Sequence, residues 1–174
     1  MAFERERGFS LVELVIVMVL AGLLVTAGIV FALPWVGREE VRGAAYQVQS
    51  HLQLARVHAI TRNRACRFVL DAQSGLIQVV DLNDPADGTD DTLVASATLP
   101  RTVSFADPSG ATPITLAALA GTNYQATYTS DGRVSEGAGT ITLNGGGRYE
   151  RVTLFGAGGL RAEIWDGAAW RAGT

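Results

Sequence analysis

The chain has 174 residues, a formal net charge of −3 and 48% hydrophobic residues, and all of its basic residues are arginine. A mildly acidic chain has no bulk electrostatic attraction for nucleic acid, so composition does not favour a general nucleic-acid-binding protein. The single cysteine, Cys66, excludes an intrachain disulfide, and its apolar neighbours Val69 and Leu70 favour a small buried residue over a reactive thiol.

An apolar run from Leu14 to Leu33 contains no charged residue. A helix of this length rises about 30 Å, which is the thickness of the hydrocarbon core of a bilayer. The many Leu, Ile and Val side chains outweigh the cost of about 3 kcal/mol for one nearby acid, Glu13. The sequence therefore predicts a membrane and assembly helix over residues 9–36.

The position of Glu13 leaves two interpretations open. The run is too long for the core of a secretory signal peptide, and the small residue Gly8 precedes it. In the first interpretation, the segment is a plain anchor and Glu13 lies near the lipid headgroups. In the second, the chain is cut after Gly8, so that Phe9 carries a new amine one helical turn from Glu13. An amine, from this helix or a neighbouring one, would then pair with the buried carboxylate and set the register of packed subunits.

A second helix is predicted over residues 37–65. Pro34 should bend or break the first helix near Leu33, because proline lacks the backbone N–H that a helix interior needs. Beyond it, apolar residues recur at steps of three and four and form one amphipathic stripe that is rich in alanine. We expect this helix to run to about Asn63, with a stripe made of Val41, Ala45, Val48, Leu52, Ala55 and Ala59.

Residues 66–174 carry the pattern of an antiparallel β-domain. Short apolar segments alternate with glycine-rich turns, which is typical of strands joined by hairpins. The fold class is therefore α+β, with a long N-terminal helix followed by an antiparallel sheet or a sandwich of two sheets. The strand candidates are CRFVLD, LIQVVDL, TVSFA, ATYTS, TITL, RVTLF and RAEIW.

The segment GFSLVE, from Gly8 to Glu13, precedes the apolar run and resembles the class III signal of type IV pilins and pseudopilins. The family pattern is Gly, then usually Phe, then Thr or Ser, Leu, an apolar residue and Glu. This resemblance implies a leader over residues 1–8, cleavage between Gly8 and Phe9 by a prepilin peptidase, and N-methylation of Phe9. It also implies that Glu13 pairs with the amine of the adjacent subunit.

The layout of the whole chain is similar to the GspH/FimT family of minor pseudopilins. Residues 52–70 resemble the family's helix end and first strand, 128–143 its glycine-rich hairpin, and 151–162 its closing strand and turn. The resemblance implies a subunit of a type II secretion pseudopilus that initiates or caps the filament; a FimT-like minor pilin of a type IV pilus, with a role in pilus assembly or DNA uptake, is the alternative. The implied partners are other minor and major pseudopilins, the prepilin peptidase and the exported protein. The implied location is the bacterial inner membrane, with a single crossing and the β-domain in the periplasm.

No catalytic, metal or cofactor site stands out. His51 and His58 are two helical turns apart, about 10.5 Å, which is too far for one metal ion. The acidic loop 83–91 suits a solvated turn, and a calcium site there stays an alternative. Because no Ser-His-Asp set or carboxylate pair is spaced for catalysis, we expect no enzyme activity, no cofactor and no metal. Trp165 and Trp170 suit either a packed hairpin or an aromatic contact for a partner.

Candidate DNA contacts lie near the C-terminus. Family members that help DNA uptake resemble one another in a Gly-Arg-x-Arg turn. The segment GGLRA matches it at Gly159 and at the second arginine, Arg161, but lacks the first arginine. Arg148, Arg151 and Arg171 could add to the patch, although acidic residues lie among them. Neutralising two or three phosphates gives weak, salt-sensitive binding, so DNA is not the favoured partner.

Overall fold

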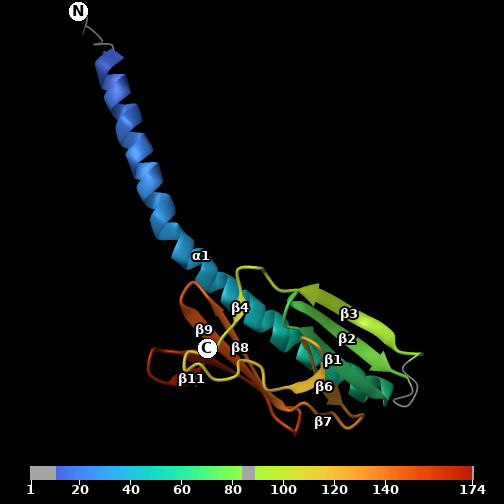
Figure 1. The fold of residues 1–174 in the computed structure, drawn as a ribbon. Helices are drawn as coiled ribbons and strands as arrows, with labels where there is room; N and C mark the ends of the chain where they lie inside the picture. Colours follow the sequence, from blue (N-terminus) through green and yellow to red (C-terminus); the bar gives the residue numbers. More distant parts are fainter. Residues whose placement is uncertain (1–10, 84–88, 174) are drawn as a thin grey trace, which may run out of the picture.

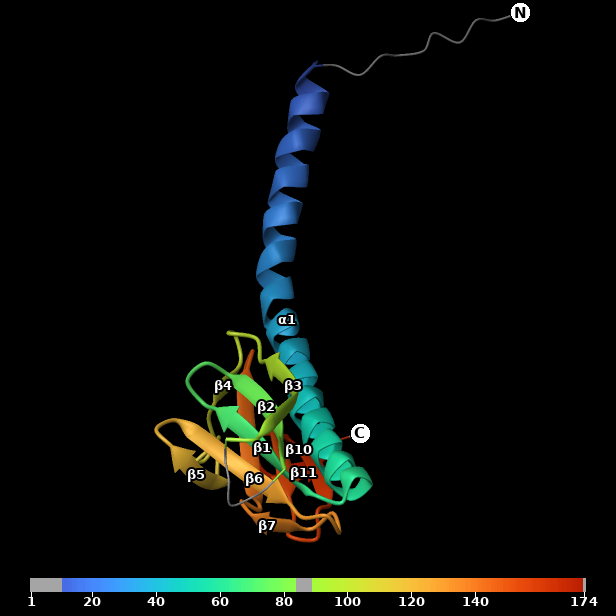
Figure 2. The same cartoon turned by 90° about the vertical axis from the view of Figure 1, so that its right-hand side faces the viewer.

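One long helix carries an all-antiparallel β-domain. The computed structural model describes residues 11–83 and 89–173, and the side chains of 27–34 lie outside this description. Helix α1 spans Leu11–Arg62; its first half projects away from the domain and its second half lies along it (Figure 1). Figure 2 shows that the strands all lie around the second half of the helix. The predicted α+β class is confirmed.

The helix, predicted to bend or break at Pro34, does not break there. α1 continues through this position as one helix of 52 residues, and it curves gently towards the domain in Figure 1. An interior proline removes one backbone hydrogen bond and bends a helix, but the turns on both sides keep theirs. Residues from Val41 onwards are also held in place by burial against the sheets, so one lost hydrogen bond does not end the helix.

The strands form two antiparallel sheets. The first has the order β3-β2-β1-β6-β5, with β7 paired to β6. Its strands are β1 Ala65–Asp71, β2 Leu76–Leu82, β3 Thr92–Thr98, β5 Ala117–Ala120, β6 Asn123–Tyr128 and β7 Val134–Glu136. The second sheet has the order β11-β10-β9-β8-β4. Its strands are β4 Ser104–Phe105, β8 Gly139–Gly145, β9 Arg148–Leu154, β10 Leu160–Trp165 and β11 Trp170–Ala172.

The core lies where α1 meets both sheets. The whole alanine-rich stripe predicted from the sequence is buried, and Ala44 is buried beside it. Alternate residues of the strands face it, among them Phe68 and Leu70 of β1 and Ile141 and Leu143 of β8. Small alanine side chains let the helix approach the strands closely, and this burial provides most of the driving force for folding.

Cys66 is fully buried in this core, as the sequence predicted. It lies opposite Asp81 of β2 and Tyr128 of β6 in the first sheet. Burial away from water raises the pKa of its thiol to about 12, because the charged thiolate loses its hydration. A thiol that stays protonated is a poor nucleophile, so Cys66 is a packing residue.

Two glycine-containing turns that are distant in the sequence meet at the far end of the domain. The backbone N–H of Val134 donates to the carbonyl oxygen of Gly156 at 2.9 Å. Gly158 has φ +80°, and a Cβ placed on it would lie 2.0 Å from the carbonyl oxygen of Gly132. Only a glycine fits at this contact, because any side chain would force the two turns apart.

We predict that Gly158→Ala destabilises the domain by about 2 kcal/mol or more, through a strained backbone and a steric clash. Gly156→Ala is the matched control, since a Cβ there would meet nothing within 4 Å. The measurement is urea unfolding of the full chain in nonionic detergent, followed by tryptophan fluorescence. Equal midpoints for the two variants would contradict the prediction.

The turn between β1 and β2 is held by one carboxylate. Asp71 accepts hydrogen bonds from the backbone N–H of Gln73 at 2.9 Å, from the Ser74 hydroxyl at 2.6 Å and from the Thr122 hydroxyl at 2.7 Å. The Ser74 and Thr122 hydroxyls and the Gln73 N–H favour the charged form and lower the pKa of Asp71 to about 2. Asp71 thus ties the first hairpin to the strand that begins at Asn123.

We predict that the stabilisation from Asp71 is complete above about pH 4 and is lost as the pH falls towards 2, because its folded pKa lies below the unfolded value. At pH 6, Asp71→Asn should lower the free energy of unfolding by about 1 kcal/mol, and the difference should shrink as the pH falls towards 2 and vanish only below it. Unfolding of both chains across this pH range tests it. A difference that does not change with pH would contradict the assignment.

Candidate functional site

The first candidate site is the projecting part of α1. Its apolar side chains are exposed in the single chain; Leu11 is 79% exposed and Leu24 is 74% exposed. Glu13 lies in the first turn, where the N-terminal end of the helix dipole favours a negative charge. Gly8 and Phe9, the predicted cleavage and methylation residues, lie outside the described residues. An isolated chain with so long an apolar surface needs a covering, by lipid or by other helices.

Within the described side chains, no helical stretch is both long and apolar enough to cross a membrane. Of the predicted segment 9–36, residues 9–10 and the side chains of 27–34 lie outside this set.

The second candidate is the arginine patch on the second sheet. Arg148 Nε lies 2.7 Å from Glu150 Oε1. Glu163 accepts from Arg151 Nη2 at 2.8 Å and from Arg161 Nη2 at 2.9 Å, one arginine on each carboxylate oxygen. Both acids are about 6% exposed, and burial raises the pKa of Glu150 against the opposing effect of Arg148. The three arginines proposed for DNA are therefore already paired with carboxylates, and a phosphate would have to compete with them.

The aromatic residues at the C-terminal hairpin complete this patch. The Trp165 and Trp170 rings are half-buried and tilted against each other, with centroids 5.4 Å apart. The guanidinium of Arg151 lies 4.1 Å from the centroid of the Trp170 ring, within cation–π range. Arg171 pairs with Asp166 in the intervening turn. Of the two interpretations of Trp165 and Trp170, these contacts within the hairpin favour the packed hairpin.

The two histidines have separate partners. His51 Nδ1 lies 2.7 Å from the carbonyl oxygen of Gln47, one helical turn earlier. His58 Nε2 lies 2.8 Å from Asp81 Oδ2 of β2. In the described part of the chain, no three His, Cys, Asp or Glu side chains gather in a way that could hold a metal ion. Residues 84–88 of the acidic loop lie outside the described residues, and Asp91 lies 4.0 Å from Arg67.

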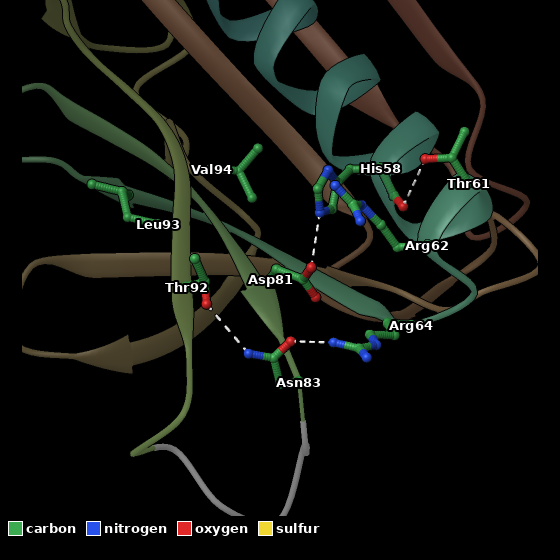
Figure 3. A pocket seen from close by; sticks show the side chains of 9 residues that line it. All are labelled: His58, Thr61, Arg62, Arg64, Asp81, Asn83, Thr92, Leu93 and Val94. Carbon is green, nitrogen blue, oxygen red and sulfur yellow. Dashed lines mark hydrogen bonds and ion pairs between the residues drawn. The ribbon is translucent and has the colours of Figure 1, made fainter.

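The third candidate site was not anticipated. A pocket of about 620 Å³ lies between the last turns of α1 and strands β2 and β3. Figure 3 shows His58 reaching from the helix to Asp81, with Arg62, Arg64 and Asn83 around the opening. Asp81 is only 7% exposed and its Oδ1 has no hydrogen-bond partner among the described atoms. The sequence carried one signal for it: Asp81 follows Ile77 and Val79 in the buried register of β2, where a charge needs a partner.

A fourth feature links the three stretches that carry the family resemblance. Arg56 Nε, from α1, donates to the carbonyl oxygen of Gly132 at 3.1 Å. Gly158, in the turn after β9, abuts the same carbonyl and lies close to Arg56 Nε. The helix end, the glycine-rich hairpin and the closing turn thus meet at one place. Their shared role is to join the far ends of the helix and both sheets.

Comparison with known proteins identifies the family. A family model described as type II transport protein GspH matches residues 44–158, and a model of the prokaryotic N-terminal methylation motif matches residues 4–29. No curated protein matches the chain by sequence.

Two solved structures share the fold. The type IV minor pilin FimU of Pseudomonas aeruginosa is 14% identical, with a TM-score of 0.51 over 77% of this chain and 94% of FimU. The minor pseudopilin EpsH of the type II secretion system of Vibrio cholerae is 18% identical, with a TM-score of 0.51 over 72% of this chain and 94% of EpsH. At these identities the likeness shows the fold alone. Because the GspH model covers more than half of the residues, the chain belongs to the family of the type II transport protein GspH, with the N-terminal motif of pilin-type, membrane-anchored proteins.

Proposed function

We propose that the chain is a minor pseudopilin of a type II secretion system that helps to initiate or cap the pseudopilus. Its work is assembly and not catalysis. The observation that carries this proposal is the shape of α1, whose second half packs one face against the domain and whose apolar first half projects from it. A projecting apolar helix suits packing first in lipid and then in a bundle of like helices. Membership of the GspH family supports the same role.

The proposed processing follows from the N-terminal motif. A prepilin peptidase removes residues 1–8 by cutting between Gly8 and Phe9, and the new amine of Phe9 is methylated. The segment 9–36 anchors the chain in the inner membrane and later enters the filament. The amphipathic helix 37–65 and the β-domain 66–174 then lie in the periplasm, where they meet other minor and major pseudopilins and an exported protein.

Glu13 has a specific task in this scheme. After cleavage it is the fifth residue of the mature chain, and it enters an apolar bundle as the subunit assembles. A buried carboxylate is costly without a positive partner, and the methylated amine of the adjacent subunit supplies one. Because a misplaced subunit would leave both charges unpaired, the pair sets the axial position of each subunit.

We assign the filament to secretion because the matching family model is that of a type II transport protein. The alternative, a FimT-like minor pilin that contacts DNA, would use Arg148, Arg151 and Arg161. Each of these arginines is already paired with the carboxylate of Glu150 or Glu163, and three guanidinium groups against two carboxylates leave a formal charge of only +1, which weakens the case for phosphate binding.

We predict that the native protein begins at Phe9 and carries one methyl group on its amine. Mass spectrometry of the N-terminal peptide, taken from membranes of the source organism, measures this. A Gly8→Leu variant is the control, because a bulky side chain at the cut should preserve the leader. Residues 1–8 intact on the wild-type chain would instead support a plain membrane anchor.

We predict that Glu13→Gln lowers incorporation into the pseudopilus at least about tenfold, because an unpaired amine in an apolar bundle costs about 3 kcal/mol or more. Immunoblotting of the sheared filament fraction measures incorporation. Cleavage of the leader should persist in this variant, since the cut lies before position 13. Glu39→Gln removes an exposed carboxylate of the same helix and should assemble normally. Normal assembly of Glu13→Gln would overturn the role given to Glu13.

A further inference from the structure

The apolar run of α1 ends close to the domain. The run extends to Leu33, and the helix already meets the domain at Gly37, where an added Cβ would lie 3.1 Å from the Cα of Gly146 in the turn between β8 and β9. The helix rises by about 6 Å from Leu33 to Gly37. The headgroup layer on each side of a bilayer is about 5–7 Å thick. If the apolar run fills the hydrocarbon core, this end of the domain therefore lies in the headgroup layer.

Close packing fixes this end of the domain to the helix. We call it the near end and define it as residues 35–42 of α1, the loop 100–103 and the segment 145–150. A Cβ on Gly145 would lie 2.5 Å from Cγ2 of Val41 and 3.3 Å from the carbonyl oxygen of Thr102, and the Thr102 hydroxyl donates to Glu40. Figures 1 and 2 show the loop between β3 and β4 at the end of the domain from which the helix projects. The near end therefore keeps its position relative to the apolar run.

Trp35 lies where the apolar run meets the near end. It is two residues beyond Leu33, and it is 65% exposed in the single chain. A tryptophan ring is largely apolar but carries one N–H donor, so it is at its most stable where hydrocarbon gives way to headgroups. The position and exposure of Trp35 are those of a residue that contacts lipid at this boundary.

Two arginines of the near end have no carboxylate partner among the described residues. Arg38 Nε donates to the carbonyl oxygen of Gly146 at 3.5 Å, and Arg101 is exposed in the loop after β3. Arg148, by contrast, is paired with Glu150. A guanidinium group binds phosphate oxygens through paired N–H donors, and every phospholipid carries a phosphate at headgroup depth. Arg38 and Arg101 therefore suit lipid phosphates.

The near end as a whole has little net charge. Its four arginines and three glutamates give a formal charge of +1; they are Arg38, Arg42, Arg101 and Arg148, and Glu39, Glu40 and Glu150. Attraction of the whole surface to an anionic membrane is accordingly small. A preference for anionic lipid therefore has to come from the individual guanidinium groups, and we expect it to be modest.

We propose that the near end rests on the membrane surface while the subunit is held in the bilayer. The Trp35 ring lies at the boundary between hydrocarbon and headgroups, and Arg38 and Arg101 bind lipid phosphates. This inference rests on the proposed anchoring by segment 9–36 and deepens it by naming the surface of the domain that meets lipid. Transfer of the subunit from the bilayer to the filament would then break these lipid contacts.

The test of depth uses the full chain in vesicles of phosphatidylcholine and phosphatidylglycerol, with tryptophan fluorescence quenched by nitroxide-labelled lipids. Trp35→Phe is the blank, and the quenching that it removes belongs to Trp35. We expect a nitroxide near the headgroup to quench Trp35 at least about twofold more strongly than one near the end of the acyl chain. Stronger quenching by the deep label would overturn the proposal. So would no quenching of Trp35 in a chain that floats with the vesicles.

The test of the arginines compares the shallow label on the two lipids at equal mole fraction. Labelled phosphatidylglycerol should quench Trp35 about twofold more strongly than labelled phosphatidylcholine, because Arg38 and Arg101 gather anionic lipid beside it. Arg38→Gln/Arg101→Gln should abolish this excess, and Arg38→Lys/Arg101→Lys should retain most of it.

The matched control is Arg62→Gln/Arg64→Gln, which removes the same charge from two exposed arginines at the far end of α1. These arginines also have no carboxylate partner among the described residues, and the control should keep the excess quenching. Equal quenching by the two lipids in the wild-type chain, or an equal loss in the control, would overturn the role of Arg38 and Arg101.

The outcome is separable from that of the proposed function. Glu13→Gln should give the wild-type quenching profile, since Glu13 lies at the other end of the apolar run from Trp35. Normal filament assembly by Glu13→Gln would count against the assembly mechanism and leave the lipid contact standing. Loss of the expected profile in a wild-type chain that assembles normally would count against the lipid contact alone. A wild-type chain that does not float with the vesicles would contradict the anchor and the lipid contact together.

Discussion

The packing of one face of α1 on two separate sheets is the contact on which the rest of the structure depends. The sheets have their own strand orders, and the helix contributes to the core beside both of them. Its small side chains, such as Ala45, Ala55 and Ala59, let the strands lie close enough to fill the interior. Because this face is fixed, the projecting half of the same helix has a defined direction relative to the domain. The projecting segment and the domain thus share one continuous helix.

At the far end of the domain, backbone groups likewise connect the helix with both sheets. Arg56 reaches from the helix to the carbonyl of Gly132, and Gly158 lies against the same carbonyl. One arginine and two glycines therefore connect the helix with turns of both sheets. The same end of the molecule holds the pocket between α1, β2 and β3, where His58 and Asp81 make a second link between helix and strand.

The parts of this fold that follow from local pattern could be predicted from the sequence. The stripe that includes Val48 and Leu52 and the burial of Cys66 are examples, because periodicity reports directly on which face is buried. Strand β3 was missed, since its alternation is lost at an exposed edge beside a bulge; β5, β7 and β11 were missed as well and are short. The continuity of the helix at Pro34 and the pairing of Arg151 with Glu163 depend on contacts between distant residues. The pocket at His58 depends on them too, and the only local signal for it is the charged Asp81 in the buried register of β2.

A continuous α1 also fixes a distance. From Glu13 to Arg62 the helix rises by about 70 Å at 1.5 Å per residue. Because the helix curves gently towards the domain, this is a length along its axis, over which one continuous helix connects Glu13 to the domain. If a charge pair at Glu13 sets the axial position of the N-terminal end, the β-domain of each subunit lies at a fixed axial position relative to its neighbours. The axial spacing of the β-domains on the outside of the filament would then depend on the contacts inside it and on the length of α1.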